Sequence, residues 1–463
     1  MLLSRLSALC ASSFVVAAMM PGVSPAHAAP PCNPKPQATC VGSSLAKQNL
    51  AGRDLRRINL SSANLAGANL AGADLRGSNL NGANLTGANL TGTNLSGALL
   101  NRANLGKVRA VGANWKGANL SFATLTEAKL ANGNFTGALL TRVLGTGPVN
   151  DFQGMVGNVD LSGANLTRAN LNGAVLEGAG LINANLTEAI LELASLVNAD
   201  LTNANLTRVN ANRTIFSTTG TYPSVATLTG ATLTGANLTR AVLAGVNLTN
   251  ADLSSANGSG ATFAGAKMRN VTMNGAVFLE SDFSEVDMSG GANLSKAVFQ
   301  GSSMSEADLT QANLAGINLV NTDLTKVKLT RANLTSAQLW SVLGTGAKLQ
   351  GSNLTKADAS NAIFNEADFT GANLSSTNLV GANLTSTEMV NVELNGALLN
   401  DAYVAGANFT GSTSLAGNPN LGGTKWSTST TCPNGRAYGS RVPSSNPATY
   451  QDCVGGSTST SPD

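Results

Sequence analysis

The sequence predicts an all-β fold in which the chain winds as a four-sided solenoid, and three observations support this. First, a Leu falls at every fifth residue through Ser62–Leu95. Second, each Leu follows a small residue two positions earlier and an Asn or Asp one position earlier, and Gly usually stands two positions later. Third, this period fits neither common element: five residues of helix turn by roughly 140°, which scatters the leucines, and an odd step along a flat strand changes face.

A five-residue period directs every Leu to the same side of the chain if the chain turns a corner within each unit. We call the Leu position i. Strand alternation then directs positions i and i−2 inward, where a narrow corner requires a small residue at i−2. Positions i−1, i+1 and i+2 are expected to face water, and Gly at i+2 suits a tight turn with positive φ. Sides of five residues give four units per coil, with backbone hydrogen bonds between stacked coils.

Tandem A(N/D)LxG units of this kind resemble the pentapeptide-repeat proteins, and the resemblance covers roughly Leu45–Phe409. It implies that family's fold, a right-handed quadrilateral β-helix, here with about eighteen coils; at ~4.8 Å per coil the rod would be roughly 85 Å long. The tail, with Trp426, TTCPNG and Cys453, looks like that of other exported members. The resemblance implies little about function, because fold does not determine function.

The first 28 residues are predicted to form a cleaved signal peptide. Arg5 supplies a positive start, Leu6–Met20 is an apolar run too short for a membrane span, and Ala26-His27-Ala28 is an A-x-A cleavage site. No later segment is long and apolar enough to span a membrane. We therefore expect an exported protein that is extracellular, periplasmic or associated with the cell wall.

The cysteines outside the signal lie in the two predicted end segments, a Pro/Cys-rich cap or lead-in at 29–44 and a cap with a Ser/Thr-rich tail at 411–463. The disulfide candidates are Cys32, Cys40, Cys432 and Cys453. Pairing within each end is the simplest of the three connectivities, since a long solenoid holds its ends apart, and export favours oxidation. Free thiols are the alternative. A zinc site would need four ligands close together, which these positions do not offer.

The repeat region is predicted to form one solenoid over 45–410, with irregularities near 143–158, 217–226 and 289–293 where the phase shifts by one, two and one residues. We interpret these as bulges or short loops; a true break at Val143–Asn158 is the alternative. The segment VLGTG occurs at Val143–Gly147 and Val342–Gly346 and is expected to be a shared turn or, alternatively, a binding loop. Arg53 falls at an inward position, which predicts that the first coil is frayed or ends there.

Some inward positions hold larger side chains one coil apart, and these predict stacked core columns. The columns are Phe263 with Phe283, Phe278 with Phe299, and Phe369 with Met389 and Phe409. We interpret them as core packing and not as a cofactor site.

Catalytic chemistry has little support in the sequence. The single His, His27, leaves with the signal, so the exported chain lacks a His base, a Ser-His-Asp triad or a His-ligated metal. The densest acidic group, Glu280–Asp287, follows the repeat spacing and not that of a calcium loop. We expect no enzyme activity, no cofactor, and no catalytic, cofactor-binding or metal-binding residue.

Charge is distributed unevenly although its formal sum is only +3. Lys47–Arg142 holds eleven basic and three acidic residues, whereas Val143 to the C-terminus holds fifteen basic and twenty-two acidic residues. A dipolar rod could rest its basic end on an anionic surface; solubility alone is the alternative. The candidate basic surface consists of Arg56, Arg57, Arg76, Arg102, Lys107, Arg109 and Lys116.

These observations favour a non-catalytic, exported structural or surface-binding solenoid, whose partner is an anionic cell-envelope polymer or another protein. One alternative is an ice- or polysaccharide-binding solenoid, motivated by threonines such as Thr86, Thr91 and Thr93. Another is a DNA mimic that interacts with gyrase, as some pentapeptide-repeat proteins do. That role needs a cytoplasmic location and a strongly acidic surface, whereas this chain has a signal and a near-neutral sum, so no nucleic-acid partner is expected. The sequence does not fix the oligomeric state.

Overall fold

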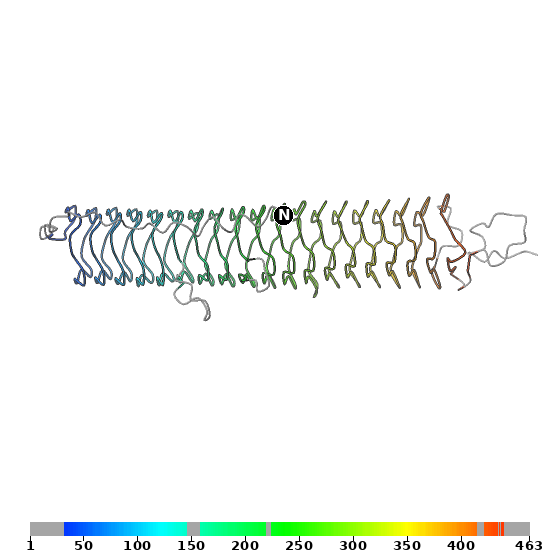
Figure 1. Ribbon diagram of the computed structural model, residues 1–463, viewed down its shortest axis with the longest axis horizontal. Helices are drawn as coiled ribbons and strands as arrows, with labels where there is room; N and C mark the ends of the chain where they lie inside the picture. The colour runs from blue at the N-terminus through cyan, green and yellow to red at the C-terminus, as the bar shows by residue number, and fades with distance from the viewer. Residues whose placement is uncertain are drawn as a thin grey trace, which may run out of the picture.

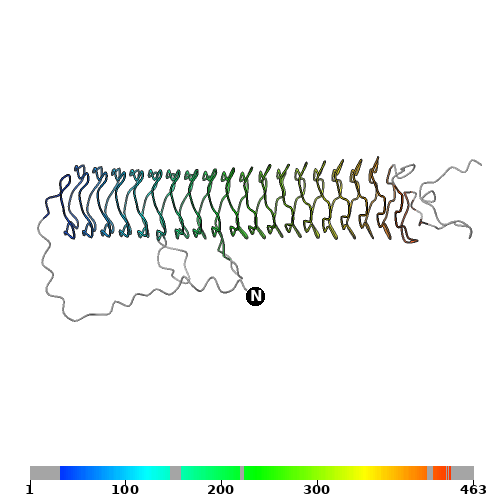
Figure 2. The same cartoon turned by 90° about the horizontal axis from the view of Figure 1, so that it is seen from above.

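A computed structural model shows a long straight rod, with the N-terminal coils at one end and the C-terminal coils at the other (Figures 1 and 2). It describes residues 32–145, 158–218, 224–413, 421–433, 435 and 437–438. None of these residues is helical. The coils are joined by single parallel bridges separated by two-residue turns, and two antiparallel bridges, Ser217 with Val225 and Thr431 with Ala437, lie beside an insert and at the C-terminal end. The predicted solenoid is confirmed.

Coils stack in a register of 20 residues, which is four units of five. Asn64 bridges Asn84, and Asn84 bridges Asn104. The second coil defines four faces through its bridging residues: face A at Asn59, face B at Asn64, face C at Asn69 and face D at Asp74. Each face comprises all units whose bridges join that column, together with the turn residues i+1 and i+2 that form the corner after each unit.

Two kinds of backbone hydrogen bond build each unit. Between coils, Leu65 donates its N–H to the Asn84 carbonyl at 2.7 Å, and Asn84 donates to the Ala63 carbonyl at 2.9 Å. Within a coil, Ala68 donates to the Leu65 carbonyl at 3.0 Å, which closes a β-turn. The third residue of that turn, Gly67, has a φ of 64°, as in a type II turn. Gly is not obligatory there, because Arg57 adopts a φ of 54° at the equivalent position.

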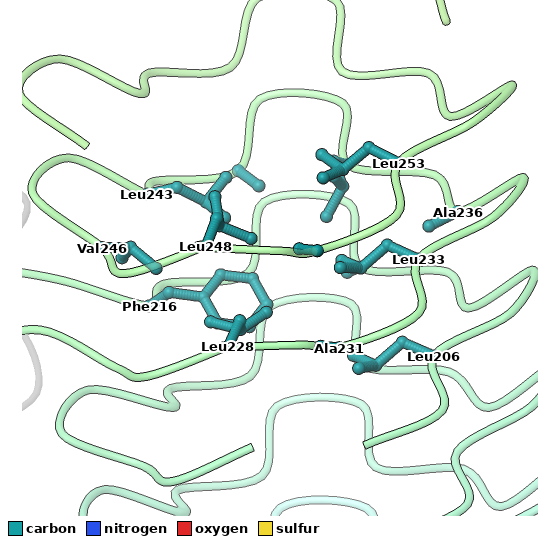
Figure 3. Close-up of a cluster of buried hydrophobic side chains, with 14 of the residues drawn as sticks. Leu206, Phe216, Leu228, Ala231, Leu233, Ala236, Leu243, Val246, Leu248 and Leu253 are labelled. Carbon is teal, nitrogen blue, oxygen red and sulfur yellow. The ribbon is translucent and has the colours of Figure 1, made fainter. Parts of the chain in front are cut away.

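The inward assignment of positions i and i−2 is confirmed, since Leu65 and Ala63 are fully buried. In Figure 3, Leu206, Leu233 and Leu253 stack one above another in successive coils of face D. Most hydroxyl residues at i−2 find a partner inside the rod: buried Thr93 donates to the Leu70 carbonyl at 2.8 Å. Ser78, at the same position of its unit, is an exception, because its buried Oγ has no hydrogen-bond partner among the described residues.

The bridge ladder continues on both sides of each irregularity, so Val143–Asn158 does not interrupt it. Leu144 bridges Val175, and Val159 donates to the Gly145 carbonyl at 3.0 Å. The register between neighbouring coils lengthens from 20 to 31 residues at this point, to 27 between Asp200 and Thr227, and to 21 between Thr272 and Asn293. The first two inserts are longer than the phase shifts alone indicate, because whole multiples of five leave the phase unchanged. Residues 146–157 and 219–223 lie outside the described part.

The predicted aromatic columns are present. The rings of Phe263 and Phe283 stack at 4.5 Å, and those of Phe278 and Phe299 at 5.4 Å. All three residues of the third column are fully buried on face C: Phe369, Met389 and Phe409.

The second VLGTG segment is a regular unit and neither a special turn nor a loop. Gly344 occupies the inward position i on face B. A Cβ at Gly344 would lie 2.5 Å from ring atoms of Phe364 in the next coil. The glycine therefore makes room for an aromatic ring. Gly145 of the first segment holds the same inward position, and residues 146–147 lie outside the described part.

The coil begins inside the segment 29–44, because Thr39 already bridges Asn59. Cys32 and Cys40 form the predicted disulfide, with a Cα–Cα distance of 5.4 Å. Arg53 is exposed at its inward position, since Asp54 beside it bridges only the following coil at Asp74. A polar inward residue therefore ends the core on this face.

At the other end, Trp426 packs against Phe409 at 5.9 Å and Tyr438 at 5.3 Å between ring centroids. Cys432 is buried and disulfide-bonded. Its predicted partner, Cys453, and the Ser/Thr-rich tail lie outside the described residues. Trp426 and Tyr438 thus extend the aromatic packing beyond Phe409, the last member of the column on face C.

Candidate binding surface

The outward Asn residues are largely engaged within the rod. Asn64 Oδ1 accepts the N–H of Ala66 at 3.1 Å, and Asn84 Oδ1 also accepts the Thr86 hydroxyl at 2.6 Å. Side-chain amides connect coils as well: Asn89 Nδ2 donates to Asn69 Oδ1 at 3.2 Å. The repeat pattern predicts that position i−1 faces water and gives no sign of this side-chain ladder between coils. Binding specificity must therefore come from residues that depart from the Asn pattern.

Three of the predicted basic residues converge at the N-terminal end. Arg56 and Arg57 form the turn after Leu55 on face D, and Arg76 follows Leu75 in the next coil. Together with Pro36, Gln37 and Gly77 they line an open cleft of about 560 Å³. The three turns are stacked on one corner of the rod, since Gln37 donates its N–H to the Arg56 carbonyl and Arg57 donates to the Arg76 carbonyl, each at 2.9 Å.

Two carboxylates orient two of the three guanidinium groups in this cleft. Arg56 donates to both oxygens of Asp54 at 2.8 and 2.6 Å, and Arg76 pairs with Asp74 in the same way, its shortest contact being 2.6 Å. The Arg56 hydrogen bonds lower the pKa of Asp54 to about 2, and those of Arg76 lower the pKa of Asp74. Both carboxylates therefore stay ionised at neutral pH.

Arg57 forms no ion pair with any described residue. Three guanidinium groups face two carboxylates, so the cleft keeps a positive balance. Arginine forks suit planar carboxylate, sulfate and phosphate groups. The arrangement can bind an anionic group but offers no general base or nucleophile in an activated setting.

The other predicted basic residues do not share one face. Arg102 lies on face A, 5.8 Å above the Phe122 ring, and Lys107 lies on face B, 3.6 Å from Glu127. Arg109 belongs to face C and Lys116 to face D. The basic region is therefore a band around the rod, with one cleft in it.

The acidic group Glu280–Asp287 also wraps around a coil, from face A through face B to face C. Among the described residues, no three His, Cys, Asp or Glu side chains lie close enough to hold a metal ion. In the same residues no helix has the length and hydrophobicity needed to cross a membrane.

The three threonines that suggested a flat binding row do not form one. Thr86 lies on face B and Thr91 on face C, and Thr93 is buried. A true file occurs instead on face D, where successive coils place a threonine at position i+1. Its members are Thr136, Thr167, Thr187, Thr207 and Thr234.

Comparison with known proteins agrees with the geometry. The family described as "Pentapeptide repeats (8 copies)" matches in overlapping segments that together span 43–142, 157–217, 226–257, 259–340 and 345–413, which is well over half of the chain. No curated protein matches it.

Several solved structures are similar. HetL, a pentapeptide repeat protein involved in heterocyst differentiation regulation from Nostoc sp. strain PCC 7120, is 22% identical, with 78% of this chain and 91% of HetL covered and a TM-score of 0.23. QnrB1, a plasmid-mediated fluoroquinolone resistance protein, is 13% identical, with 58% and 89% covered and a TM-score of 0.18. A pentapeptide repeat protein from the Arabidopsis thaliana thylakoid lumen is 25% identical over 29% of this chain and 68% of its own, with a TM-score of 0.14.

Proposed function

The chain belongs to the pentapeptide-repeat family, and we propose that it is an exported, non-catalytic rod that attaches to an anionic cell-envelope polymer through its N-terminal end. Proteins of this family are generally non-catalytic. The observation that carries the proposal is the cleft in which Arg56, Arg57 and Arg76 converge.

Binding would combine one site of oriented arginine side chains with a weaker electrostatic attraction from the basic residues around it. Arg57 is free to take a carboxylate, sulfate or phosphate group of the polymer, while Asp54 and Asp74 hold the neighbouring arginines in place. The basic band around the first coils adds weak contacts that salt screens over ~8 Å at physiological strength. Repeated weak contacts along a polymer sum to useful affinity.

The test measures binding of the full chain to purified cell wall and to dextran sulfate, at low and at high salt. Arg57→Glu should weaken binding several-fold, because it reverses the unpaired charge in the cleft. Arg331→Glu is the matched control: Arg331 has the same place in its unit, a similar φ of 57°, and no ion pair among the described residues. Absence of binding at low salt, or equal losses in both variants, would refute the proposal.

Ice or polysaccharide binding remains the second candidate, now through the threonine file of face D. Coil stacking repeats its hydroxyls at ~4.8 Å. Thr136, Thr167 and Thr187 donate to Asn oxygens of their own units at 2.6–2.7 Å, which fixes their orientation. Thr167→Val with Thr187→Val should abolish thermal hysteresis or glycan binding if this candidate holds, and should leave dextran sulfate binding unchanged.

A gyrase-binding DNA mimic is the third candidate. The near-neutral net charge of the whole chain is only weak evidence against this role, since acidic residues concentrate on part of the rod. The predicted export still argues against it. Supercoiling assays with the full chain should show no inhibition of gyrase; dose-dependent inhibition would favour this candidate over envelope binding.

The proposal also covers location and form. We propose that residues 1–28 are cleaved, that the coil is right-handed with about eighteen turns, and that the two disulfide-containing ends act as caps over the repeat domain at 45–410. Fractionation of cells with an antibody against the protein, together with N-terminal sequencing, tests the export. An intact Met1 in the cytoplasmic fraction would overturn it.

A further inference from the structure

The exposed hydrophobic residues are confined almost entirely to two adjacent faces. In the C-terminal part, faces A and B expose Leu279, Trp340, Leu343, Ile363 and Tyr403. In the N-terminal part the same faces expose Leu99, Phe122, Leu139 and Leu144. Face C exposes only Val111 and Ile182 among the described residues, and face D exposes none there. These residues recur at intervals along one side of the rod, and we call them together the apolar stripe. Exposed apolar surface gathered on one side marks an interaction site.

The excess of acidic over basic residues in the C-terminal part lies on these two faces. Within residues 243–413, face A carries Glu280, Asp358 and Asp401. Face B carries Asp282, Glu285, Glu306, Asp323 and Glu366, with Lys326 as the single base on the two faces. Faces C and D of the same coils hold seven bases and six acids. The acidity therefore belongs to one side of the rod and does not reflect the composition of the segment.

The opposite sign prevails on faces A and B at the other end. Within residues 32–145 these faces carry Lys47, Arg102, Lys107 and Arg142 and a single acid, Glu127. Arg102, Arg142, Glu280 and Asp401 even occupy the same position, i+2 at the corner between faces A and B. Faces A and B are thus basic at one end of the rod and acidic at the other, and they expose large hydrophobic residues in both parts.

We propose that two copies of this chain associate side by side and antiparallel through faces A and B. An antiparallel pair brings the basic end of each copy against the acidic end of the other, and a two-fold axis makes each such contact twice. A parallel pair would instead set acids against acids, which disfavours that arrangement. The apolar stripe then becomes the dry part of the interface. This proposal is independent of the polymer-binding cleft, which lies on face D.

Charge-swapped variants of the full chain test the orientation. Arg102→Glu with Arg142→Glu makes the i+2 charges at the corner between faces A and B acidic at both ends, and Glu280→Lys with Asp401→Lys makes these corner charges basic at both ends. Each double variant alone should self-associate roughly tenfold more weakly, since like charges then meet at both contacts. An equimolar mixture should restore the dimer, because both contacts of the mixed pair join opposite charges.

The readouts are mass by sedimentation and length by small-angle X-ray scattering: the dimer should double the mass and keep the length of one rod. Arg331→Glu with Lys356→Glu reverses two charges at the same i+2 position on faces C and D and should leave association unchanged. Trp340→Ser with Leu343→Ser should weaken association, whereas Val111→Ser with Ile182→Ser on face C should not.

Three outcomes would overturn the proposal. A single-chain mass at every concentration up to the solubility limit would show that the edge has another occupant. A doubled length would mean end-to-end association. Failure of the mixed charge-swapped variants to associate, while the unchanged chain does, would exclude the antiparallel contact. Circular dichroism of every variant establishes that a loss of association is not a loss of fold.

Discussion

Residues 32–145 and 243–413 build the same coil from the same inward residues, yet their outward residues differ in sign. Ala83-Asn84-Leu85-Thr86 and Ala382-Asn383-Leu384-Thr385 are identical units on face B, and Leu85 and Leu384 are both fully buried. The N-terminal region nevertheless presents an arginine cleft, whereas the C-terminal region presents an acidic, apolar edge. Fold and surface are thus nearly independent variables in this protein.

The largest effect should come from a charge in the core, and it should be equal in the two regions. Leu85→Asp and Leu384→Asp each place a carboxylate without a partner in a dry column, which should cost several kcal/mol of unfolding free energy. Asn84→Ala and Asn383→Ala, one residue away, should cost about 1 kcal/mol each through lost hydrogen bonds. Urea unfolding measures all four. A large cost in one region only would break the equivalence of the two regions.

Removing a disulfide should affect only its own end. Cys32→Ser with Cys40→Ser opens a crosslink between residues eight apart in sequence. Closing a loop of about that length stabilises by roughly 2.5 kcal/mol in the chain-entropy model. Hydrogen exchange should therefore speed up in the coil around Thr39–Asn59 and stay unchanged beyond residue 243. Uniform loss of protection along the rod would mean that the two regions unfold as one cooperative unit.

Gly344 distinguishes the sequence pattern from the packed structure. The repeat pattern suggests that Gly344→Leu restores a missing core residue, but the Phe364 ring already fills that space. Overpacking should cost about 1–3 kcal/mol. The double variant Gly344→Leu with Phe364→Leu should recover most of the loss, as measured by urea unfolding. Stabilisation by Gly344→Leu alone would contradict this packing.

The smallest effect concerns pH and is local to the N-terminal end. Asp54 has a pKa of about 2 in the folded rod, below its ordinary 3.8, because Arg56 donates to it. A depressed pKa contributes stability that is present above pH about 4 and is lost as the pH falls toward 2. NMR titration of Asp54 should give the low midpoint, and Arg56→Gln should raise it toward the ordinary value. If the titration midpoint of Asp54 is the same in Arg56→Gln, the ion pair with Arg56 is not the cause of the low pKa.

The inward residues could be assigned from the sequence because a four-sided coil is the arrangement in which a period of five points every Leu toward the axis of the rod. Outward residues could not be assigned so well. The pattern treats position i−1 as solvated, but coil stacking places Asn69 within hydrogen-bond distance of Asn89 and engages both amides. The length of an insert such as that after Gly145 could not be predicted either. An insert that is longer by five residues produces the same phase shift in the repeat.

The sequence by itself determined the solenoid, its core columns and the Cys32–Cys40 pair, since each depends on local spacing. Only the tertiary structure decided which outward residues share a face, because neighbours on a face are 20 to 31 residues apart depending on the inserts between them. Residues close in the sequence, such as Lys107 and Arg109, fall on different faces, whereas Arg102 and Arg142 lie on one edge. Charge summed along the chain therefore could not reveal the arginine cleft or the acidic edge, which exist only once the coils are stacked.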